Sequence, residues 1–226
     1  MKMNREVAGL ITFILETVPS SQLIQKWGST LFYSTVLSLQ RNYPAVRSFK
    51  SLEKDFRDYF QKQTTLLTTN QVAANNWFSD LRDRIHLDST RAYLSGSLYE
   101  DRKVTFNTSM QDEIERRVGE QTSYLASFRD EFNAGKYKGT PSKALWRAGL
   151  YASFLAVMFR AGWIAKQAED TVIFWRVTPG KEHCGECLEL EMGGPYTRKT
   201  LPKLPGEATC RGNCGCYLET KQGKKV

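Results

Sequence analysis

The chain has 226 residues and a formal net charge of +8, with 32 basic and 24 acidic side chains, two histidines and five cysteines. Hydrophobic residues make up 41% and aromatic residues 12% of the sequence, which excludes an intrinsically disordered protein. The length suits one domain or two small ones with a buried core. Two histidines leave little room for histidine-based metal catalysis, and the moderate positive charge favours an anionic partner without identifying one.

We expect no segment that spans a membrane. The most apolar run, Ala148–Phe159, has twelve residues between two arginines, whereas a spanning helix needs about 20. The first residues imitate a signal peptide, but glutamates bracket the short apolar run, and its apolar residues recur at helical spacing. An amphipathic helix over residues 4–18 is therefore the better interpretation.

Helical periodicity continues from this first helix to about residue 168. A second helix is expected after Pro19, with Ser20 or Ser21 as its N-cap. Apolar residues at three- and four-residue steps predict further helices over 49–67, 70–87 and 109–132.

A looser stretch is expected over residues 88–108, because it contains Gly96 and weaker periodicity, with a short strand over 103–106. The longest helix then opens at Thr140-Pro141, with the threonine as N-cap and the proline at the first helical position. It runs to about residue 168 and is apolar around most of its circumference, which is typical of a helix buried between partners. Those partners are either helices of the same chain or, in a homo-oligomer, another subunit.

The periodicity changes near residue 170, where β-branched and aromatic residues over 171–177 predict a strand. Turns and cysteines follow, and a second short strand is expected over 217–219. The predicted fold class is therefore mainly α-helical, with a small C-terminal β-hairpin or zinc-ribbon-like module. The predicted parts are a multi-helix body with a long central helix (1–170), the cysteine-rich zinc-binding module (171–220) and a basic tail (221–226).

All five cysteines lie between Cys184 and Cys216, and the first 183 residues contain none. A secreted disulfide scaffold would spread its cysteines along the chain, so this clustering indicates a local metal site with reduced thiolates. A C-x-x-C motif on a tight turn with Gly185 directs two sulfurs at one ion, and a second group 22 residues later can complete a tetrahedral Zn²⁺ site.

Five cysteines compete for four positions around such an ion. The candidate ligands are Cys184, Cys187, Cys210 and either Cys214 or Cys216. His183 is a substitute ligand or a solvated neighbour, and disulfides and free thiols remain alternatives to zinc. A site with four protein ligands leaves no position for a substrate, which makes the zinc structural.

The sequence contains no catalytic motif that we recognise, including P-loop, G-x-S-x-G and H-E-x-x-H patterns. A zinc-stapled nuclease would need an acid–base set, and none is evident, so we expect no enzyme. The charge surplus divides into +5 for residues 1–170 and +3 for 171–226, without a dense basic patch. The basic residues near the cysteines either form a solvated face or belong to a nucleic-acid-binding zinc module, which is the alternative function. Its candidate contacts are Arg198, Lys199, Lys203, Arg211, Lys221, Lys224 and Lys225.

Four segments together resemble the C-terminal end of the tailed-bacteriophage minor head proteins, the phage Mu F-like head morphogenesis family. The segments are Trp175–Cys187 (WRVTPGKEHCGEC), Gly194–Pro202 (GPYTRKTLP), Leu204–Gly206 and Cys210–Leu218 (CRGNCGCYL). The resemblance covers about residues 155–220, and the helices before them are matched only in being helical. Many members carry a histidine shortly before the final C-x-C. This chain has Cys210 instead, one residue farther from that motif.

The resemblance implies a virion component present in few copies at the portal vertex of the head. It implies contact with the portal or the major capsid protein, and sometimes with DNA. The expected location is therefore the virion, and the host cytoplasm during assembly.

Overall fold

The structure is a computed structural model, and it describes residues 49–99, 107–211 and 214–226. The helices expected over 4–18 and after Pro19, and the strand expected over 103–106, lie outside these residues. The described ranges contain five helices and one two-stranded antiparallel sheet, which confirms a mainly α-helical protein with a small C-terminal sheet.

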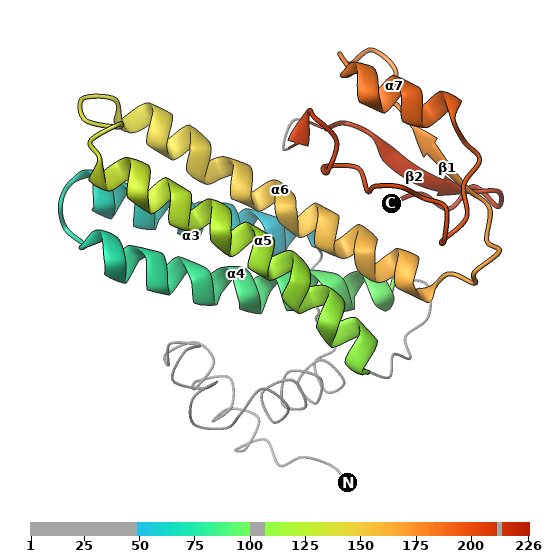
Figure 1. The fold of residues 1–226 in the computed structure, drawn as a ribbon, viewed down its shortest axis with the longest axis horizontal. Coiled ribbons are helices and arrows are strands. Elements are labelled where there is room, and N and C mark those ends of the chain that lie inside the picture. Colours follow the sequence, from blue (N-terminus) through green and yellow to red (C-terminus); the bar gives the residue numbers. More distant parts are fainter. Residues whose placement is uncertain (1–48, 100–106, 212–213) are drawn as a thin grey trace, which may run out of the picture.

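Four long helices form a bundle, and the C-terminal unit lies beside the C-terminal half of its last helix (Figure 1). The helices are α3 (Phe49–Thr68), α4 (Ala74–Ser97), α5 (Thr108–Asn133) and α6 (Pro141–Lys166). Helix α6 contacts all three others, most extensively α4 and α3. Large aromatic side chains fill the space between the helices, among them Phe56, Phe60, Trp77 and Phe128.

Helix α6 begins at Pro141, as the sequence predicts, and Thr140 occupies the N-cap position without making a side-chain capping hydrogen bond. By length and composition α6 is apolar enough to cross a membrane, the single such helix among the described residues. The expectation of no spanning segment considered only its uninterrupted apolar run. Because α6 packs on three other helices and 56% of its most apolar window is buried, it has the properties of a core helix.

The prediction of a looser stretch from Asp88 is wrong for residues 88–97, which continue helix α4. Gly96, which the sequence analysis treated as a breaker, is instead a packing residue. A Cβ atom at Gly96 would lie 1.8 Å from the carbonyl oxygen of Phe159 in α6. Glycine is therefore required because the two helix backbones touch.

The same close approach recurs one turn along α6. A Cβ atom at Gly162 would lie 1.9 Å from the carbonyl oxygen of Tyr93. The hydroxyl of Ser97 joins the two helices, because its oxygen lies 3.1 Å from the carbonyl oxygens of both Tyr93 and Gly162. Helices α4 and α6 are thus held at backbone contact.

The C-terminal unit is built on strands β1 (Ile173–Arg176) and β2 (Tyr217–Thr220), which pair antiparallel with Ile173 opposite Thr220. Helix α7 (Gly185–Met192) packs near β1. The last residues turn back along β2, where the Val226 N–H donates to the carbonyl of Leu218 at 3.0 Å. The segment predicted as a basic tail therefore adds backbone hydrogen bonds to the sheet.

Candidate metal centre

The C-x-x-C motif lies at the start of a helix and not on the tight turn that the sequence analysis expected. Cys184 is the N-cap of α7, and the Cys187 N–H donates to its carbonyl oxygen at 3.0 Å. Gly185 needs no special backbone conformation, because its φ is not among the positive values. Residues three apart in the first helical turn lie on one side of the helix, so the two sulfurs still approach each other.

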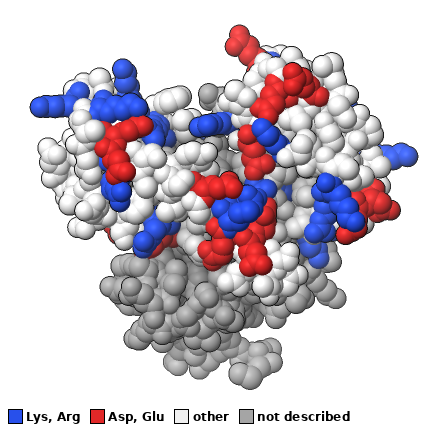
Figure 2. Space-filling view, viewed as in Figure 1, with Lys and Arg blue, Asp and Glu red and all other residues white. Residues whose placement is uncertain are grey.

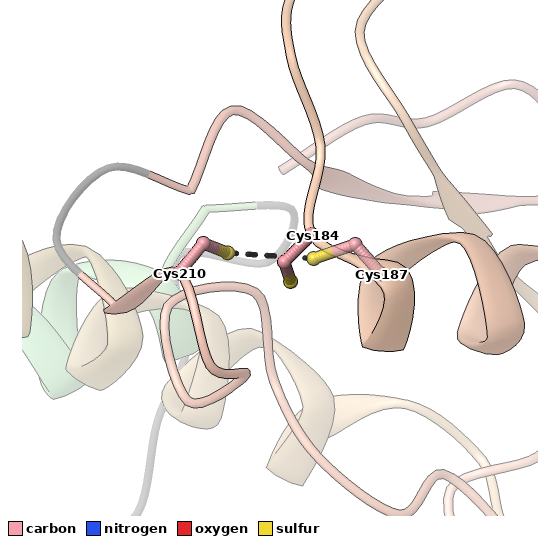
Figure 3. Close-up of side chains that lie close together, drawn as sticks. All are labelled: Cys184, Cys187 and Cys210. Atoms are coloured by element: carbon pink, nitrogen blue, oxygen red, sulfur yellow. Dashed lines mark hydrogen bonds between the residues drawn. The ribbon is translucent and has the colours of Figure 1, made fainter.

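Cys187 is the buried centre of the cysteine cluster. Its sulfur lies 3.4 Å from the sulfur of Cys210 and 4.0 Å from that of Cys214. Two overlapping trios share Cys187, and the sulfurs within each lie within 4.8 Å of one another. The trios are Cys184, Cys187 and Cys210, shown in Figure 3, and Cys187, Cys214 and Cys216. All five predicted cysteines are thus brought together as free thiols and positioned to hold a metal ion, in a donor set compatible with zinc.

The geometry separates the two candidates for the fourth ligand. Cys214 interacts with the thiols of both Cys187 and Cys210, which belong to the first trio. The sulfur of Cys216 lies 3.5 Å from Nδ1 of His183. Cys216 also interacts with Cys187. Because Cys214 interacts with two members of the first trio, we infer that Cys214 is the fourth ligand and Cys216 the fifth thiol.

The ring of His183 is oriented by the carbonyl oxygen of Thr178, 2.8 Å from its Nε2. We assign the proton to Nε2 because a carbonyl can only accept, and this leaves the lone pair of Nδ1 facing the thiol of Cys216. A thiol beside such a base has the arrangement of a nucleophile. Cys216 is only 2% exposed, however, so its thiol is buried away from any substrate in solution, although His183 is half-buried.

Burial makes three thiols of the cluster, Cys187, Cys210 and Cys216, harder to ionise. Burial raises the pKa of Cys187 far above its ordinary value, and the neighbouring thiols act in the same direction. Burial likewise raises the pKa of Cys210 to about 12 and raises that of Cys216. Burial also acts on Cys184, but hydrogen bonds from Cys187 and Cys210 outweigh it and lower the pKa. A metal ion must therefore displace protons from the cluster, and binding is expected to strengthen as the pH rises.

Glu186, inside the C-x-x-C motif, ties helix α7 to the loop that carries Cys210. Its carboxylate accepts hydrogen bonds from the backbone N–H of Thr209 at 2.7 Å and from the Thr209 hydroxyl at 2.6 Å. It also pairs with Lys203, and these contacts lower the pKa of Glu186 to about 2. This contact holds the two cysteine-bearing segments together from outside the cluster.

The basic residues predicted for nucleic-acid contact are largely engaged by neighbouring groups. Ion pairs join Lys199 to Glu169, Lys203 to Glu186 and Lys225 to Glu219, while Arg198 donates to the carbonyl of Gln167 and Arg211 lies over Tyr124. Lys221 and Lys224 are exposed in the segment that turns back along β2. On the face in Figure 2, acidic and basic side chains alternate and form no field of one sign.

A cleft of about 550 Å³ lies between α5, α6 and the loop that leads into the cysteine cluster. Two of its aromatic side chains reach solvent, Trp146 with 64% and Tyr124 with 48% exposure. The Arg211 guanidinium lies 5.6 Å from the ring centre of Tyr124, and Arg211 has a positive φ of 44°. The sequence analysis treated Trp146 as part of a buried helix and did not find this cleft.

Comparison with known proteins gives no match to a family model, a curated protein or a solved structure. The function is therefore inferred from the cysteine geometry and from the motif residues quoted above.

Proposed function

We propose that the chain is a non-enzymatic bacteriophage minor head protein whose C-terminal unit is stabilised by one structural Zn²⁺. Cys184, Cys187, Cys210 and Cys214 would hold the ion. The observation that carries the zinc proposal is the convergence of cysteines from two segments on the buried sulfur of Cys187. Zinc accepts four thiolates in a tetrahedral arrangement, and such closed sites contribute to folding.

The size of the C-terminal unit supports a structural role for the ion. Two four-residue strands and one eight-residue helix form a small unit, and units of this size commonly depend on a metal or on disulfides. We propose a zinc-ribbon-like module, because a strand precedes the first cysteine pair and another follows the last cysteine. Helix α7 between them is its departure from a plain hairpin.

The head function is supported by the motif segments Trp175–Cys187 and Cys210–Leu218, whose described residues supply the end of β1, the start of α7, the five cysteines and the start of β2. We further propose that the cleft beside α6 contacts the portal or the major capsid protein. Its exposed Trp146 and Tyr124 and the neighbouring Arg211 are of the residue types that dominate protein–protein interfaces. The positive charge of Arg211, which lies over the ring of Tyr124, would be complementary to an acidic side chain of the partner.

The proposal has two separable tests. Elemental analysis of the purified full chain should find about one zinc per chain. If protein prepared under reducing conditions is found to contain no zinc, the metal site is refuted. A tagged copy supplied during infection should co-purify with proheads or virions. Absence from both would refute the head function and leave the zinc site standing.

Within the co-purification test, Trp146→Ala should reduce incorporation into heads at least tenfold, because truncating a central aromatic hot-spot residue of an interface typically costs about 2 kcal/mol or more. Leu188→Ala is the matched control, since Leu188 is also exposed but lies on α7, away from the cleft. Equal incorporation of the Trp146 variant and the wild-type chain would remove the cleft from the proposal.

Nucleic-acid binding remains the alternative function, and the ion pairs of Lys199, Lys203 and Lys225 weigh against it. Its distinguishing property is steep salt dependence, because phosphate contacts release counterions. A filter-binding titration at 50 and 200 mM salt measures this directly. Affinity that falls about a thousandfold over this range would favour the alternative over a head protein that makes no DNA contact.

A further inference from the structure

The cleft lies on the side of the bundle where helix packing is least complete. Helices α5 and α6 run antiparallel from the loop that joins them (Figure 1), and α6 contacts α5 much less than it contacts α4 and α3. The apolar residues of α6 that line the cleft recur at steps of three and four, and they are Trp146, Leu150, Phe154 and Val157. At 1.5 Å per residue this stripe is about 16 Å long. The cleft is therefore a groove along two helices.

The loop that leads to Cys210 forms the third wall of the cleft. A Cβ atom at Gly206 would lie 2.7 Å from Cγ2 of Val157, so the loop lies directly on α6. An ion pair between Arg117 of α5 and Glu207 ties the same loop to the other helix. All three walls are thus held by contacts within the chain.

The charges that line the cleft leave one cation without a carboxylate. The other charged residues of the lining are all engaged in ion pairs: Glu120 with Arg116, Glu207 with Arg117, and Arg147 with Glu131. Arg211 is exposed and makes no ion pair among the described residues, and its guanidinium lies over the ring of Tyr124. An occupant with a carboxylate near Tyr124 would therefore complement the charge of the cleft.

The two helical walls also determine which backbone conformation an occupant can adopt. Away from the helix ends, the backbone N–H and C=O groups of α5 and α6 are paired within their own helices, so an extended segment would find no backbone partners there. Burying unpaired backbone groups costs free energy. A helix brings its backbone groups already paired, and amphipathic helices bind grooves through apolar side chains at i, i+3 or i+4, and i+7. A stripe of about 16 Å corresponds to about three helical turns.

We infer that the cleft receives an acidic amphipathic helix of the portal or the major capsid protein, about three turns long. Its apolar side chains enter between Trp146 and Val157, and one of its carboxylates pairs with Arg211. This inference rests on the proposed function, which it extends from a contact surface to the kind of segment that is bound. The helix would complete the packing of the bundle between α5 and α6.

The test selects ligands for the purified full chain from a library of random peptides about 16 residues long. Counter-selection against Trp146→Ala removes peptides that bind elsewhere. The retained peptides should carry apolar residues at steps of three and four and at least one Asp or Glu. Apolar residues at every second position, or no peptide retained by the wild-type chain over Trp146→Ala, would overturn the inference.

Proline in the peptide provides a second readout that does not depend on variants of the chain. Replacing a central residue on the polar face of a selected peptide by proline breaks a helix without removing an apolar contact. The affinity, measured by fluorescence anisotropy, should fall at least about a hundredfold. An affinity unchanged by the proline contradicts a bound helix and overturns the inference.

The charge of the cleft is tested with the same peptides. Arg211→Gln should weaken binding about two- to fivefold at low salt, and Arg211→Lys should bind like the wild type, which separates the charge from any effect on the neighbouring Cys210. Lys62→Gln is the matched control, because Lys62 is an exposed cation of α3 that does not line the cleft. Equal losses in Arg211→Gln and Lys62→Gln overturn the inference.

The outcome for the helix is separate from the outcome for the head function. The peptide selection uses the purified chain alone, whereas the head function is decided by co-purification with proheads or virions. A chain that enters heads but selects no helical peptide overturns the inference and leaves the proposed function standing. A chain that is absent from both proheads and virions refutes the proposed function, and with it the assignment of the helix to a head protein.

Discussion

The bundle and the C-terminal unit are ordered by different means. In the bundle, 20- to 26-residue helices bury aromatic side chains such as Trp77, Phe60 and Phe128 with almost no exposed surface. In the C-terminal unit, the buried side chains are few, and two of them are the cysteines Cys187 and Cys216. Burial of apolar surface is enough to stabilise the bundle. The C-terminal unit has a smaller apolar core, and its cysteine sulfurs converge in addition.

Removal of the metal is expected to have the largest effect and to divide the two regions. Cys187→Ser removes the sulfur common to both trios, so bound zinc should fall from about one per chain to less than a tenth. Structural zinc contributes roughly 10–16 kcal/mol in small zinc-dependent folds, so the C-terminal unit should lose its order. Far-UV circular dichroism should stay strongly helical, because α3 to α6 contain none of the cysteines.

Cys216→Ser is the control for this experiment, because Cys216 is the fifth thiol and faces His183. It should retain about one zinc per chain. If Cys216→Ser loses zinc and Cys214→Ser keeps it, the fourth ligand is Cys216. Full zinc content in Cys187→Ser would contradict the assignment of the centre.

The next effect concerns the bundle alone. Gly162→Ala places a methyl group 1.9 Å from the carbonyl oxygen of Tyr93, so α4 and α6 must separate. Overpacking of this kind costs about 1–3 kcal/mol or more, measured as a lower urea midpoint of helix unfolding. Zinc content should be unchanged, in contrast to the cysteine variants.

Gly119→Ala in α5 is the matched substitution, since nothing lies within 4 Å of its added methyl group. It should stabilise the bundle by about 0.5–1 kcal/mol, because alanine has the higher helix propensity. If both glycine variants behave alike, backbone contact between α4 and α6 does not determine the packing.

The smallest effect is a pH dependence at the α5–α6 end of the bundle. Partial burial raises the pKa of Glu131, but hydrogen bonds from Tyr137 and Lys136 and the charge of Arg147 outweigh it and lower the pKa below 4.5. A lowered folded-state pKa means that the carboxylate stabilises the fold above pH 4.5 and loses this contribution as the pH falls through the folded value. Glu131→Gln should therefore reduce stability by no more than about 1 kcal/mol at pH 6.

Urea unfolding of the wild type and of Glu131→Gln between pH 3 and pH 6 measures this difference, and any loss of zinc at low pH affects both proteins. The two curves should converge as the pH falls. A difference that grows toward pH 3 would show that the carboxylate is not stabilised in the folded bundle.

The sequence was sufficient for features encoded over short distances. Thr140-Pro141 predicted the start of α6, and the cysteine spacing predicted the cluster, because cysteines close in sequence stay close in space whether the backbone between them is helical or a turn. The extension of α4 beyond Asp88 was missed, because Gly96 looks like a breaker until its contact with Phe159 is known. The helical start of the C-x-x-C motif was missed for the same reason, since Gly185 suggested a turn.

The seam between the two regions was not predictable from local pattern. Arg160 and Pro205 are 45 residues apart in sequence, and Arg117 and Glu207 are 90 apart. The exposure of Trp146 likewise depends on how α5 and the loop that leads to Cys210 are positioned relative to α6. Such contacts arise from tertiary packing, and no short window of the sequence contains both partners.

The 22-residue separation between Cys187 and Cys210 also has a consequence for the unfolded chain. An ion bound to both cysteines closes a loop of this length before any strand has paired. Loop closure of this size removes conformational entropy equivalent to about 3 kcal/mol from the unfolded state. Metal bound early, as the chain is synthesised or refolds, is therefore expected to shorten the search by which β2 finds β1.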